Sequence, residues 1–345
     1  MKTEEHYSLQ HLNTFRLAVK TRHFIEYENE HELAVSLRDA HACKLSILPI
    51  GQGSNLLFLK DFDGIVLHSA IKGITLIAET DENVLLRVGA AEIWDDVVQY
   101  AVEQGWGGIE NLSLIPGETG AAAVQNIGAY GMEIKDVVET IEAISTVNYE
   151  KRTFLNADCK YDYRSSIFKN QPTYVITHVT LRLQKKPVFH LEYGNLKAIL
   201  GTNKPVTLQK IREAAITIRR EKLPDPNELG NAGSFFMNPI VRSEKLKNLI
   251  KDYPSIPYYP AKDGFVKISA GWLIEQCGLK GKRFGQVGVY GHQALVIVNY
   301  GGATGYEIAQ IADYIRETVY LRFDVQLVPE VKYINCSTPM DCFAS

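Results

Sequence analysis

The fold of this chain is decided by the stretch Gly117-Glu118-Thr119-Gly120-Ala121-Ala122-Ala123-Val124-Gln125-Asn126-Ile127-Gly128-Ala129-Tyr130-Gly131. It contains four glycines and four alanines, and neither lysine nor arginine. Glycine has no Cβ and permits positive φ, so successive backbone N–H groups can face one concavity and hold a phosphate or the edge of a ring. The stretch is interpreted as a bare loop that a ligand approaches closely. The alternative is a tight loop with a small-residue packing face.

Earlier in the chain, a first glycine turn, Gly51-Gln52-Gly53-Ser54-Asn55-Leu56-Leu57, lies between two apolar segments that are typical of strands. Leu56 stands at the position where the dinucleotide fingerprint of Rossmann folds has its third glycine, and no Gly-Lys-Ser/Thr closes either glycine-rich stretch. The two stretches therefore predict a dinucleotide site that is not built on a Rossmann fold.

Length and charge limit the function classes. The 345 residues are enough for two or three domains, and 40 acidic against 37 basic residues give a net charge of −3, which offers no footprint for nucleic acid or an anionic membrane. The N-terminus is polar and no apolar run approaches ~18 residues, so neither a signal peptide nor a membrane span is expected. A soluble, cytoplasmic protein is expected. Neither a disulfide framework nor a metal site is indicated by the five scattered cysteines, Cys43, Cys159, Cys277, Cys336 and Cys342.

The first half of the chain has the pattern of an α+β unit. Helices are expected from Glu30 to His41 and from Ile93 to Gln104, the second ending at Gly105. β-rich segments are expected at Gly64–His68, Val84–Ala90, Val137–Val147 and Thr173–Leu183.

A domain boundary is expected near residues 201–207, before a helix from Thr207 to about Lys222. Beyond it, the clearest elements are a strand at Ala294–Asn299 and a helix that begins with the capping-box spacing Thr304…Glu307 and continues to about Leu321. A strand at Phe323–Val328 would follow. This succession predicts a β-α-β crossover in a smaller α/β unit.

Three local groups of residues could carry chemistry. Arg164 offers a planar fork suited to a carboxylate, or it forms an ion pair with Asp158 or Asp162. Ser234 follows a Gly/Asn/Ala turn that is not a nucleophile elbow, so it is either a proton donor or ligand contact, or a turn serine bonded to its own backbone. Glu330 ends an apolar strand and either meets solvent or faces a cleft that would raise its pKa.

Taken together, these segments resemble the UDP-N-acetylenolpyruvoylglucosamine reductases, the MurB family of bacterial peptidoglycan synthesis. The resemblance covers nearly the whole chain and is specific in the order and spacing of its motifs, which are Asn13-Thr14-Phe15, Gly51 to Leu57, Ile115-Pro116-Gly117, Gln125 to Gly131, Tyr163-Arg164, Gly230 to Phe236 and Pro329-Glu330.

The resemblance implies an α+β fold with two domains. An FAD-binding domain of the vanillyl-alcohol-oxidase/PCMH type would cover residues 1–205, in subdomains of about 1–70 and 71–205. A smaller α/β substrate-binding domain would cover residues 206–345, and its last strand would return to the flavin cleft.

The resemblance also implies the site residues. Arg164, Ser234 and Glu330 occupy the family's catalytic positions. Non-covalent FAD would be held by Gly51, Gln52, Gly53, Ser54, Asn55, Leu56, Pro116, Gly117, Gly120, Ala121, Gln125, Asn126, Gly128, Ala129 and Gly131. The sugar-nucleotide substrate would be held by Tyr193, Lys222, Asn238 and Gln293, where the Tyr193 segment is similar to the longer form of the family. The family often has a proline between Gly120 and Gln125; its absence here predicts a less rigid loop.

The reaction implied by the resemblance begins with hydride transfer from NADPH to FAD. Hydride then passes from flavin N5 to the enolpyruvyl β-carbon of UDP-N-acetyl-3-O-(1-carboxyvinyl)-glucosamine, and protonation of the α-carbon gives UDP-N-acetylmuramate. Arg164 would polarise the substrate carboxylate with Glu330 nearby, and Ser234 would deliver the proton. A monomer is expected, with no nucleic-acid or membrane partner.

Two other functions are compatible with parts of the pattern. A flavin oxidase or dehydrogenase of the same superfold, acting on an alcohol or lactone, is disfavoured because the first flavin loop has no histidine to tether FAD and because such an enzyme has no use for the Ser234 loop. A non-catalytic nucleotide-binding regulator would be expected to lack at least one of Arg164, Ser234 and Glu330, and all three are present.

Overall fold

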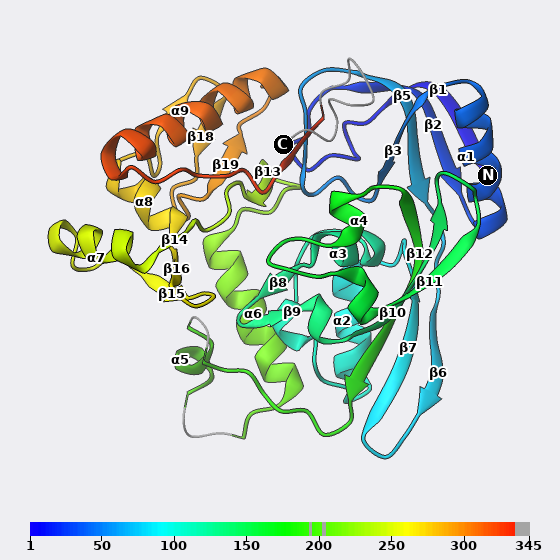
Figure 1. The fold of residues 1–345 in the computed structure, drawn as a ribbon, viewed down its shortest axis with the longest axis horizontal. Coiled ribbons are helices and arrows are strands. Elements are labelled where there is room, and N and C mark those ends of the chain that lie inside the picture. The colour runs from blue at the N-terminus through cyan, green and yellow to red at the C-terminus, as the bar shows by residue number, and fades with distance from the viewer. Residues whose placement is uncertain (193–194, 202–204, 335–345) are drawn as a thin grey trace.

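The structure is a computed structural model that describes residues 1–192, 195–201 and 205–334. Figure 1 shows two lobes side by side, one built from the early part of the chain and one from the late part. The proposed substrate contact Tyr193 lies outside the described residues. No helix in the described part of the chain has both the length and the apolar character needed to cross a lipid bilayer.

A four-stranded sheet opens the chain. Its strands lie in the order β1-β2-β5-β3, with β1 antiparallel to β2 and the other pairs parallel. The strands are β1 (Lys2–Ser8), β2 (Lys20–Tyr27), β5 (Phe62–Ser69) and β3 (Ser46–Ile50). Helix α1 (Glu30–Ala42) begins where the Asn29 side chain accepts a hydrogen bond from Glu32 N, and it buries Leu33 and Leu37. The helix expected from Glu30 to His41 is thus confirmed.

A five-stranded antiparallel sheet follows, in the order β11-β10-β12-β7-β6. Its strands are β11 (Lys151–Leu155), β10 (Val138–Ser145), β12 (Tyr174–Gln184), β7 (Asn83–Gly89) and β6 (Ile74–Glu79). Helix α2 (Trp94–Glu103) packs over one face with Trp94, Val97, Val98 and Ala101 fully buried. The strands expected at Val84–Ala90, Val137–Val147 and Thr173–Leu183 are thus confirmed. The side chains of Ile144 and Val175 pack in one apolar cluster with Leu33 and Leu37 of α1, so the centre of the sheet is covered on both faces.

The glycine-rich stretch is not a bare loop throughout. Residues Thr119–Gln125 form helix α3, which ends at Asn126 with a φ of 45°. The expectation of a bare loop is wrong for this part because three successive alanines favour a helix and Ala122 and Ala123 are buried in the core. Gly120 is needed for close packing, since a Cβ there would lie 2.9 Å from the Cβ of Ala90.

Short elements complete the first lobe and link it to the second. They are β4 (Leu56–Phe58), η1 (Glu110–Leu112), β8 (Gly128–Ala129), β9 (Met132–Glu133), η2 (Ile134–Asp136), η3 (Asn156–Cys159), α4 (Ile167–Asn170) and α5 (Leu196–Leu200). Helix α6 (Leu208–Lys222) has Thr207 as its N-cap, so the helix expected from Thr207 to about Lys222 is confirmed. It packs on the first lobe, where Arg212 forms a bidentate ion pair with Asp95 at 2.6 and 2.9 Å.

The second lobe contains two antiparallel sheets, in the orders β13-β19-β18-β17 and β14-β16-β15. The strands are β13 (Gly230–Ser234), β14 (Ile240–Arg242), β15 (Tyr258–Pro260), β16 (Phe265–Ile268), β17 (Arg283–Phe284), β18 (Val287–Val289) and β19 (Val296–Asn299). Helices α7 (Ser243–Asp252), α8 (Ala270–Gln276) and α9 (Gly305–Phe323) lie around them (Figure 1).

The expected β-α-β crossover is wrong. The capping box of Thr304 and Glu307 starts α9 as predicted, but Phe323 still belongs to that helix and residues 324–328 form no strand. The alternating apolar pattern is explained by packing, because Phe323, Val325 and Leu327 are each buried in the core of this lobe. The next strand, β20 (Lys332–Ile334), instead pairs in parallel with β4 of the first lobe.

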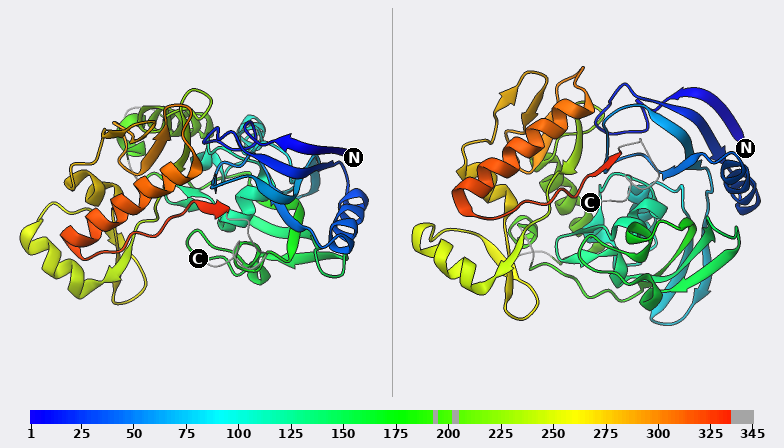
Figure 2. Two further views of the ribbon diagram at one scale, coloured as in Figure 1. Left: turned by 90° about the horizontal axis from the view of Figure 1, so that it is seen from above. Right: turned by 45° about the horizontal axis from the view of Figure 1, so that its top comes forward.

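Strand β20 thus returns from the second lobe to the first, where it lies beside the segment after the Gly51–Asn55 turn (Figure 2). A single apolar cluster contains Phe15, Phe58, Phe235, Phe236 and Ile334, all nearly or fully buried. This shared core holds β20 beside the segment that follows the glycine turn at residues 51–55. The division at residues 205 and 206 stays a prediction, and α6 is packed on the side of the first lobe.

Candidate active site

A cavity of about 1700 Å³ is lined by residues from both lobes. Most small-molecule sites enclose about 300–1,000 Å³, so this cavity has room for two sizeable ligands. Both glycine-rich stretches, the Arg164 segment, the Ser234 turn and Glu330 contribute to its wall.

Arg164 and Glu330, which are far apart in sequence, form an ion pair in this wall. Arg164 Nε lies 3.0 Å from Glu330 Oε1, and their side chains are only 19% and 18% exposed. Arg164 Nη2 also donates to the carbonyl of Gly128 at 2.7 Å, and Nη1 makes a longer contact of 3.4 Å with the carbonyl of Asn126. A guanidinium has five N–H groups, and the contacts with described residues engage three of them. Two N–H groups therefore remain for a ligand carboxylate.

The burial of Glu330 changes its acidity. Desolvation raises the pKa of Glu330 above its usual value, and the positive charges of Arg164 and Lys169 offset only part of this rise. Lys169 donates to the carbonyl of Arg164 at 3.0 Å, and burial lowers the pKa of this lysine. The wall therefore holds a carboxyl group that keeps its proton to higher pH than an exposed glutamate.

The Ser234 turn is fixed directly beside Glu330 by the backbone. Glu330 N donates to the carbonyl of Phe235 at 2.8 Å, and Met237 N donates to the carbonyl of Val328 at 2.9 Å. Ser234 is half-buried at the end of β13 and lines the cavity together with Arg164 and Glu330. The three predicted catalytic residues are thus brought together.

The first glycine turn lines the cavity over its whole predicted length, with Gly51, Gln52, Gly53, Ser54, Asn55 and Leu56. Gly53 has a φ of 62°, and a Cβ there would overlap the carbonyl oxygen of Leu12. Ser54 Oγ donates to the carbonyl of Pro116 at 3.2 Å and so links this turn to the second stretch.

The second stretch contributes only some of its predicted contacts. Those that line the cavity are Pro116, Gly117, Gly120, Ala121, Gln125 and Gly128. Ala129 and Gly131 lie outside the lining. Asn126 is fully buried beneath it, where its amide donates to the carbonyl of Asp162 at 2.8 Å and accepts from Lys135 N. The structure gives Asn126 the role of ending α3 and anchoring the Asp162 turn.

Only one of the predicted substrate contacts in the described residues lines the cavity. Asn238 lines the cavity, and its Oδ1 accepts from Ala270 N at 2.9 Å at the start of α8. Lys222 is exposed at the end of α6 and Gln293 accepts from Leu295 N, and neither belongs to the lining. Leu223, which follows Lys222, and Leu295, two residues after Gln293, do line it.

Sequence reasoning missed several polar residues of the cavity wall, which are Thr14, Tyr163, Lys169, Arg219, Arg220 and Lys332. Arg219 Nε donates to the carbonyl of Leu114 at 3.1 Å, and burial lowers its pKa. A usable signal was present: Arg212 and Arg219 recur at a spacing of seven on the apolar side of α6, where an arginine needs a partner or a ligand.

Two orphaned polar atoms fit a polar cofactor in this cavity. Thr14 Oγ1 and Gln125 Oε1 are buried without a hydrogen-bond partner among the described residues, and both residues belong to the lining. Buried polar atoms are normally paired, so these two atoms point to a hydrogen-bonding ligand. Together with the glycine turns, they fit the dinucleotide expected from the sequence.

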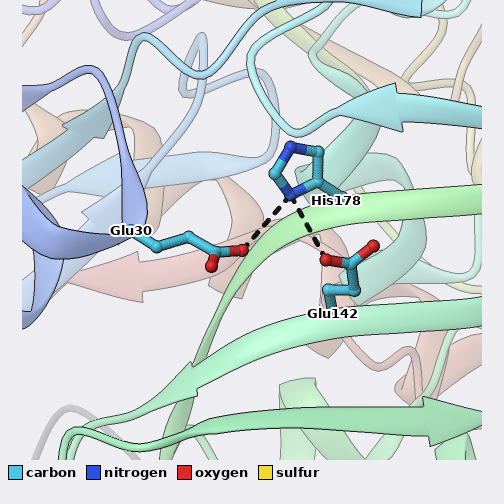
Figure 3. Close-up of side chains that lie close together, drawn as sticks. All are labelled: Glu30, Glu142 and His178. Atoms are coloured by element: carbon cyan, nitrogen blue, oxygen red, sulfur yellow. Dashed lines mark ion pairs between the residues drawn. The ribbon is translucent and has the colours of Figure 1, made fainter. Parts of the chain in front are cut away.

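A second cluster of titratable side chains lies away from the cavity. Figure 3 shows Glu30 from α1 and Glu142 from β10 on either side of His178 from β12, with separations of 3.5 and 3.8 Å. Arg87 and Lys151 already neutralise the two carboxylates, and the Arg87 hydrogen bonds, opposed by burial, lower the pKa of Glu142 to about 2. This cluster is an ion-pair network between α1 and the second sheet.

Comparisons with known proteins identify the family of the chain. Residues 21–149 match the model of an FAD binding domain, and residues 225–334 match that of the UDP-N-acetylenolpyruvoylglucosamine reductase C-terminal domain. A crystal structure of this reductase (MurB) from Thermus caldophilus is similar in fold, with a TM-score of 0.70 at 22% identity, and the match covers 97% of this chain and 100% of that one. A 6-hydroxy-D-nicotine oxidase from Arthrobacter nicotinovorans shares the fold more distantly, with a TM-score of 0.51 at 10% identity over 94% and 86% of the chains.

Sequence relatives are considerably closer. The chain is 51% identical to UDP-N-acetylenolpyruvoylglucosamine reductase of Porphyromonas gingivalis, covering 97% of this chain and 100% of that protein. It is 45% identical to the protein of that name from Bacteroides fragilis, over 96% and 100%, and 43% identical to the one from Pseudomonas putida, over 95% and 97%. The two-domain α+β fold with an FAD-binding domain of the PCMH type is thereby established, and the chain belongs to the UDP-N-acetylenolpyruvoylglucosamine reductase (MurB) family.

Proposed function

We propose that Arg164, Ser234 and Glu330 are the catalytic residues with which this chain reduces the enolpyruvyl group of a UDP-sugar in peptidoglycan precursor synthesis. The observation that carries this proposal is their convergence: an Arg164–Glu330 ion pair and the Ser234 turn lie in one wall of a cavity large enough for two ligands. As a member of this family the chain is a flavoenzyme with FAD as its cofactor. The chemistry that FAD would supply when bound is the transfer of hydride from NADPH to the enolpyruvyl double bond.

The FAD site is proposed along the two glycine-rich stretches. Backbone groups of Gly51–Leu56 and of the segments around Gly117 and Gly120 would surround the diphosphate. Thr14 and Gln125 would bind the cofactor through their orphaned oxygens. The first turn contains no histidine, so the cofactor would be held without a covalent bond.

The chemical roles follow from what each side chain can hold or donate. The two N–H groups of Arg164 that remain would bind the substrate carboxylate, so positive charge lies where negative charge develops during reduction. When Glu330 takes up a proton, the ion pair becomes a hydrogen bond from Arg164 to a neutral carboxyl group, which would support that charge without repelling it and fits the burial and raised pKa of Glu330. The hydroxyl of Ser234 would deliver the proton to the α-carbon.

The substrate's UDP portion is proposed to lie toward the second lobe. Asn238 lines this side of the cavity, with Lys222 and Gln293 adjacent to lining residues. Tyr193 is proposed as a further contact from the sequence pattern alone. We further propose that the chain is a monomer, that it acts in the cytoplasm, and that its substrate is a small sugar nucleotide.

The assignment of Arg164 is tested by Arg164→Lys, which keeps the charge and removes the planar fork. The rate of flavin reoxidation by the enolpyruvyl substrate should fall by about 10²-fold, the range typical of a lost charge-stabilising donor. Flavin reduction by NADPH should remain near the wild-type rate. Arg152→Lys on the exposed strand β11 is the matched control and should change neither half-reaction. A wild-type rate of reoxidation in Arg164→Lys would contradict the assignment.

A further inference from the structure

A chain of three titratable side chains lies behind the first glycine turn. His68 on β5 has Nδ1 at 3.1 Å from Glu26 Oε2 on β2 and Nε2 at 3.3 Å from Glu118 Oε1, at the residue preceding α3. A neutral imidazole has one N–H and can donate to only one of these carboxylates. The charged imidazolium has two N–H groups and satisfies both, so the geometry matches the protonated form.

Glu118 connects this chain of groups to the cavity. Its side chain is 8% exposed and lines the cavity, and a Cβ on Gly51 would lie 2.9 Å from its Oε2. The carboxylate therefore stands against the turn proposed to hold the FAD diphosphate. An unneutralised carboxylate would repel a diphosphate there, because charges interact strongly where little water screens them.

His68 is the cation placed to neutralise Glu118. It is 15% exposed, it is not itself part of the lining, and it stacks on Phe24. The neighbouring strand β3 contributes no charged group, while Lys2 on β1 lies beyond Glu26 and the phenol of Tyr27 lies near Glu118. Burial alone would lower the pKa of His68, but the hydrogen bonds and charges of Glu118 and Glu26 outweigh it and raise the pKa above its usual value.

We propose that His68 is a positioning residue for the flavin, whose protonation neutralises Glu118 and thereby links FAD affinity to pH. The proposal rests on the FAD site proposed above. The sign follows from linkage: a diphosphate beside the Glu26–His68–Glu118 chain favours the imidazolium, so the complex takes up a proton where the free protein has lost it. FAD affinity is then high below the pKa of His68 in the free protein and falls as pH rises above it.

The test is the dissociation constant of FAD, measured by fluorescence titration of flavin-stripped protein between pH 6 and pH 8.5. For the wild type, Kd should rise by about tenfold across this range, which corresponds to a shift of about one pKa unit in the linked group. The FAD diphosphate itself does not titrate here. Failure of wild-type protein to bind FAD at any pH would refute the FAD site, whereas tight but pH-independent binding would refute only the role of His68.

Variants locate the effect. His68→Asn should bind FAD at pH 6 as weakly as the wild type binds it at pH 8.5, with a flat profile. Glu118→Gln should bind more tightly than the wild type at pH 8.5, because no charge is left to neutralise, and it tests the proposal even if His68→Asn folds poorly. The double variant should regain at pH 6 the affinity that His68→Asn loses.

His23→Asn is the matched control. His23 lies on β2, 3.9 Å from Glu5 and outside the cavity lining, so the wild-type dependence of FAD affinity on pH should be kept. A wild-type profile in His68→Asn, or no gain in Glu118→Gln, would overturn the proposal.

Discussion

Arg164 has a left-handed backbone conformation, with a φ of 53°, which a non-glycine residue adopts only when its surroundings hold it there. Lys169 fixes its carbonyl group, and the carbonyl of Gly128 and the carboxylate of Glu330 fix its guanidinium. Arginine as a carboxylate-binding residue could be predicted from the sequence, but the choice of Glu330 over Asp158 or Asp162 could not. That choice depends on how the chain brings Glu330, 166 positions later in the sequence, back to Arg164.

At this scale the sharpest prediction concerns Ser234. Ser234→Ala removes a proton donor that only the second half-reaction uses, so flavin reoxidation by the enolpyruvyl substrate should slow by about 10²–10⁴-fold. Flavin reduction by NADPH should hardly change, and Ser234→Cys should recover part of the rate. Single-turnover absorbance traces of both half-reactions measure this. Equal slowing of both half-reactions, or of neither, would exclude the proton-donor role.

The raised pKa of Glu330 predicts a pH dependence. The protonated form is populated below that pKa and is lost as pH rises through it. The rate of substrate-driven reoxidation should therefore fall with rising pH. In Glu330→Gln the side chain is neutral at every pH, so this fall should disappear. Stopped-flow traces from pH 5.5 to pH 9 report it, and the same fall in the variant would assign the titration to another group.

At the scale of elements, the starts of two helices were predicted correctly, one of them from a capping box. Thr207 and Thr304 each start a helix where predicted, because their side chains accept a backbone N–H of the first turn. Helix α3 was missed because glycines flank its short alanine core, and local sequence does not reveal that Ala122 and Ala123 are buried. Residues 323–328 were misassigned because burial against a core and pairing in a sheet both require alternating apolar residues.

The first glycine turn gives a prediction about one element. Gly53→Ala places a Cβ against the carbonyl of Leu12 at a positive φ, so it should destabilise the fold by about 2 kcal/mol or more and weaken FAD binding. Gly105→Ala is the control, since Gly105 also has a positive φ of 77° but no atom lies within 4 Å of the new Cβ. It should cost about 1 kcal/mol and leave FAD affinity unchanged. Urea unfolding and flavin titration compare the two, and equal losses of FAD affinity would contradict the close-approach role of Gly53.

At the scale of the whole molecule, the site exists because strand β20 returns from the second lobe to the first. Strand β20 pairs with β4 directly after the glycine turn, and Asn55 Nδ2 donates to the carbonyl of Glu330 at 3.1 Å. The motifs could be recognised in the sequence, whereas the lining residues Lys169 and Lys332 became visible only in the fold. Their place in the cavity depends on how α4 and β20 pack together, and no local pattern encodes that packing.

The most direct test of the central claim is an anaerobic single turnover followed by flavin absorbance. Purified protein should show the absorbance of FAD that acid precipitation releases, and NADPH should bleach it. Addition of UDP-N-acetyl-3-O-(1-carboxyvinyl)-glucosamine should then restore the absorbance with one UDP-N-acetylmuramate formed per flavin, whereas UDP-N-acetylglucosamine, which lacks the enolpyruvyl group, should not. Bleached flavin that the enolpyruvyl substrate fails to restore, or restoration without formation of UDP-N-acetylmuramate, would contradict the account.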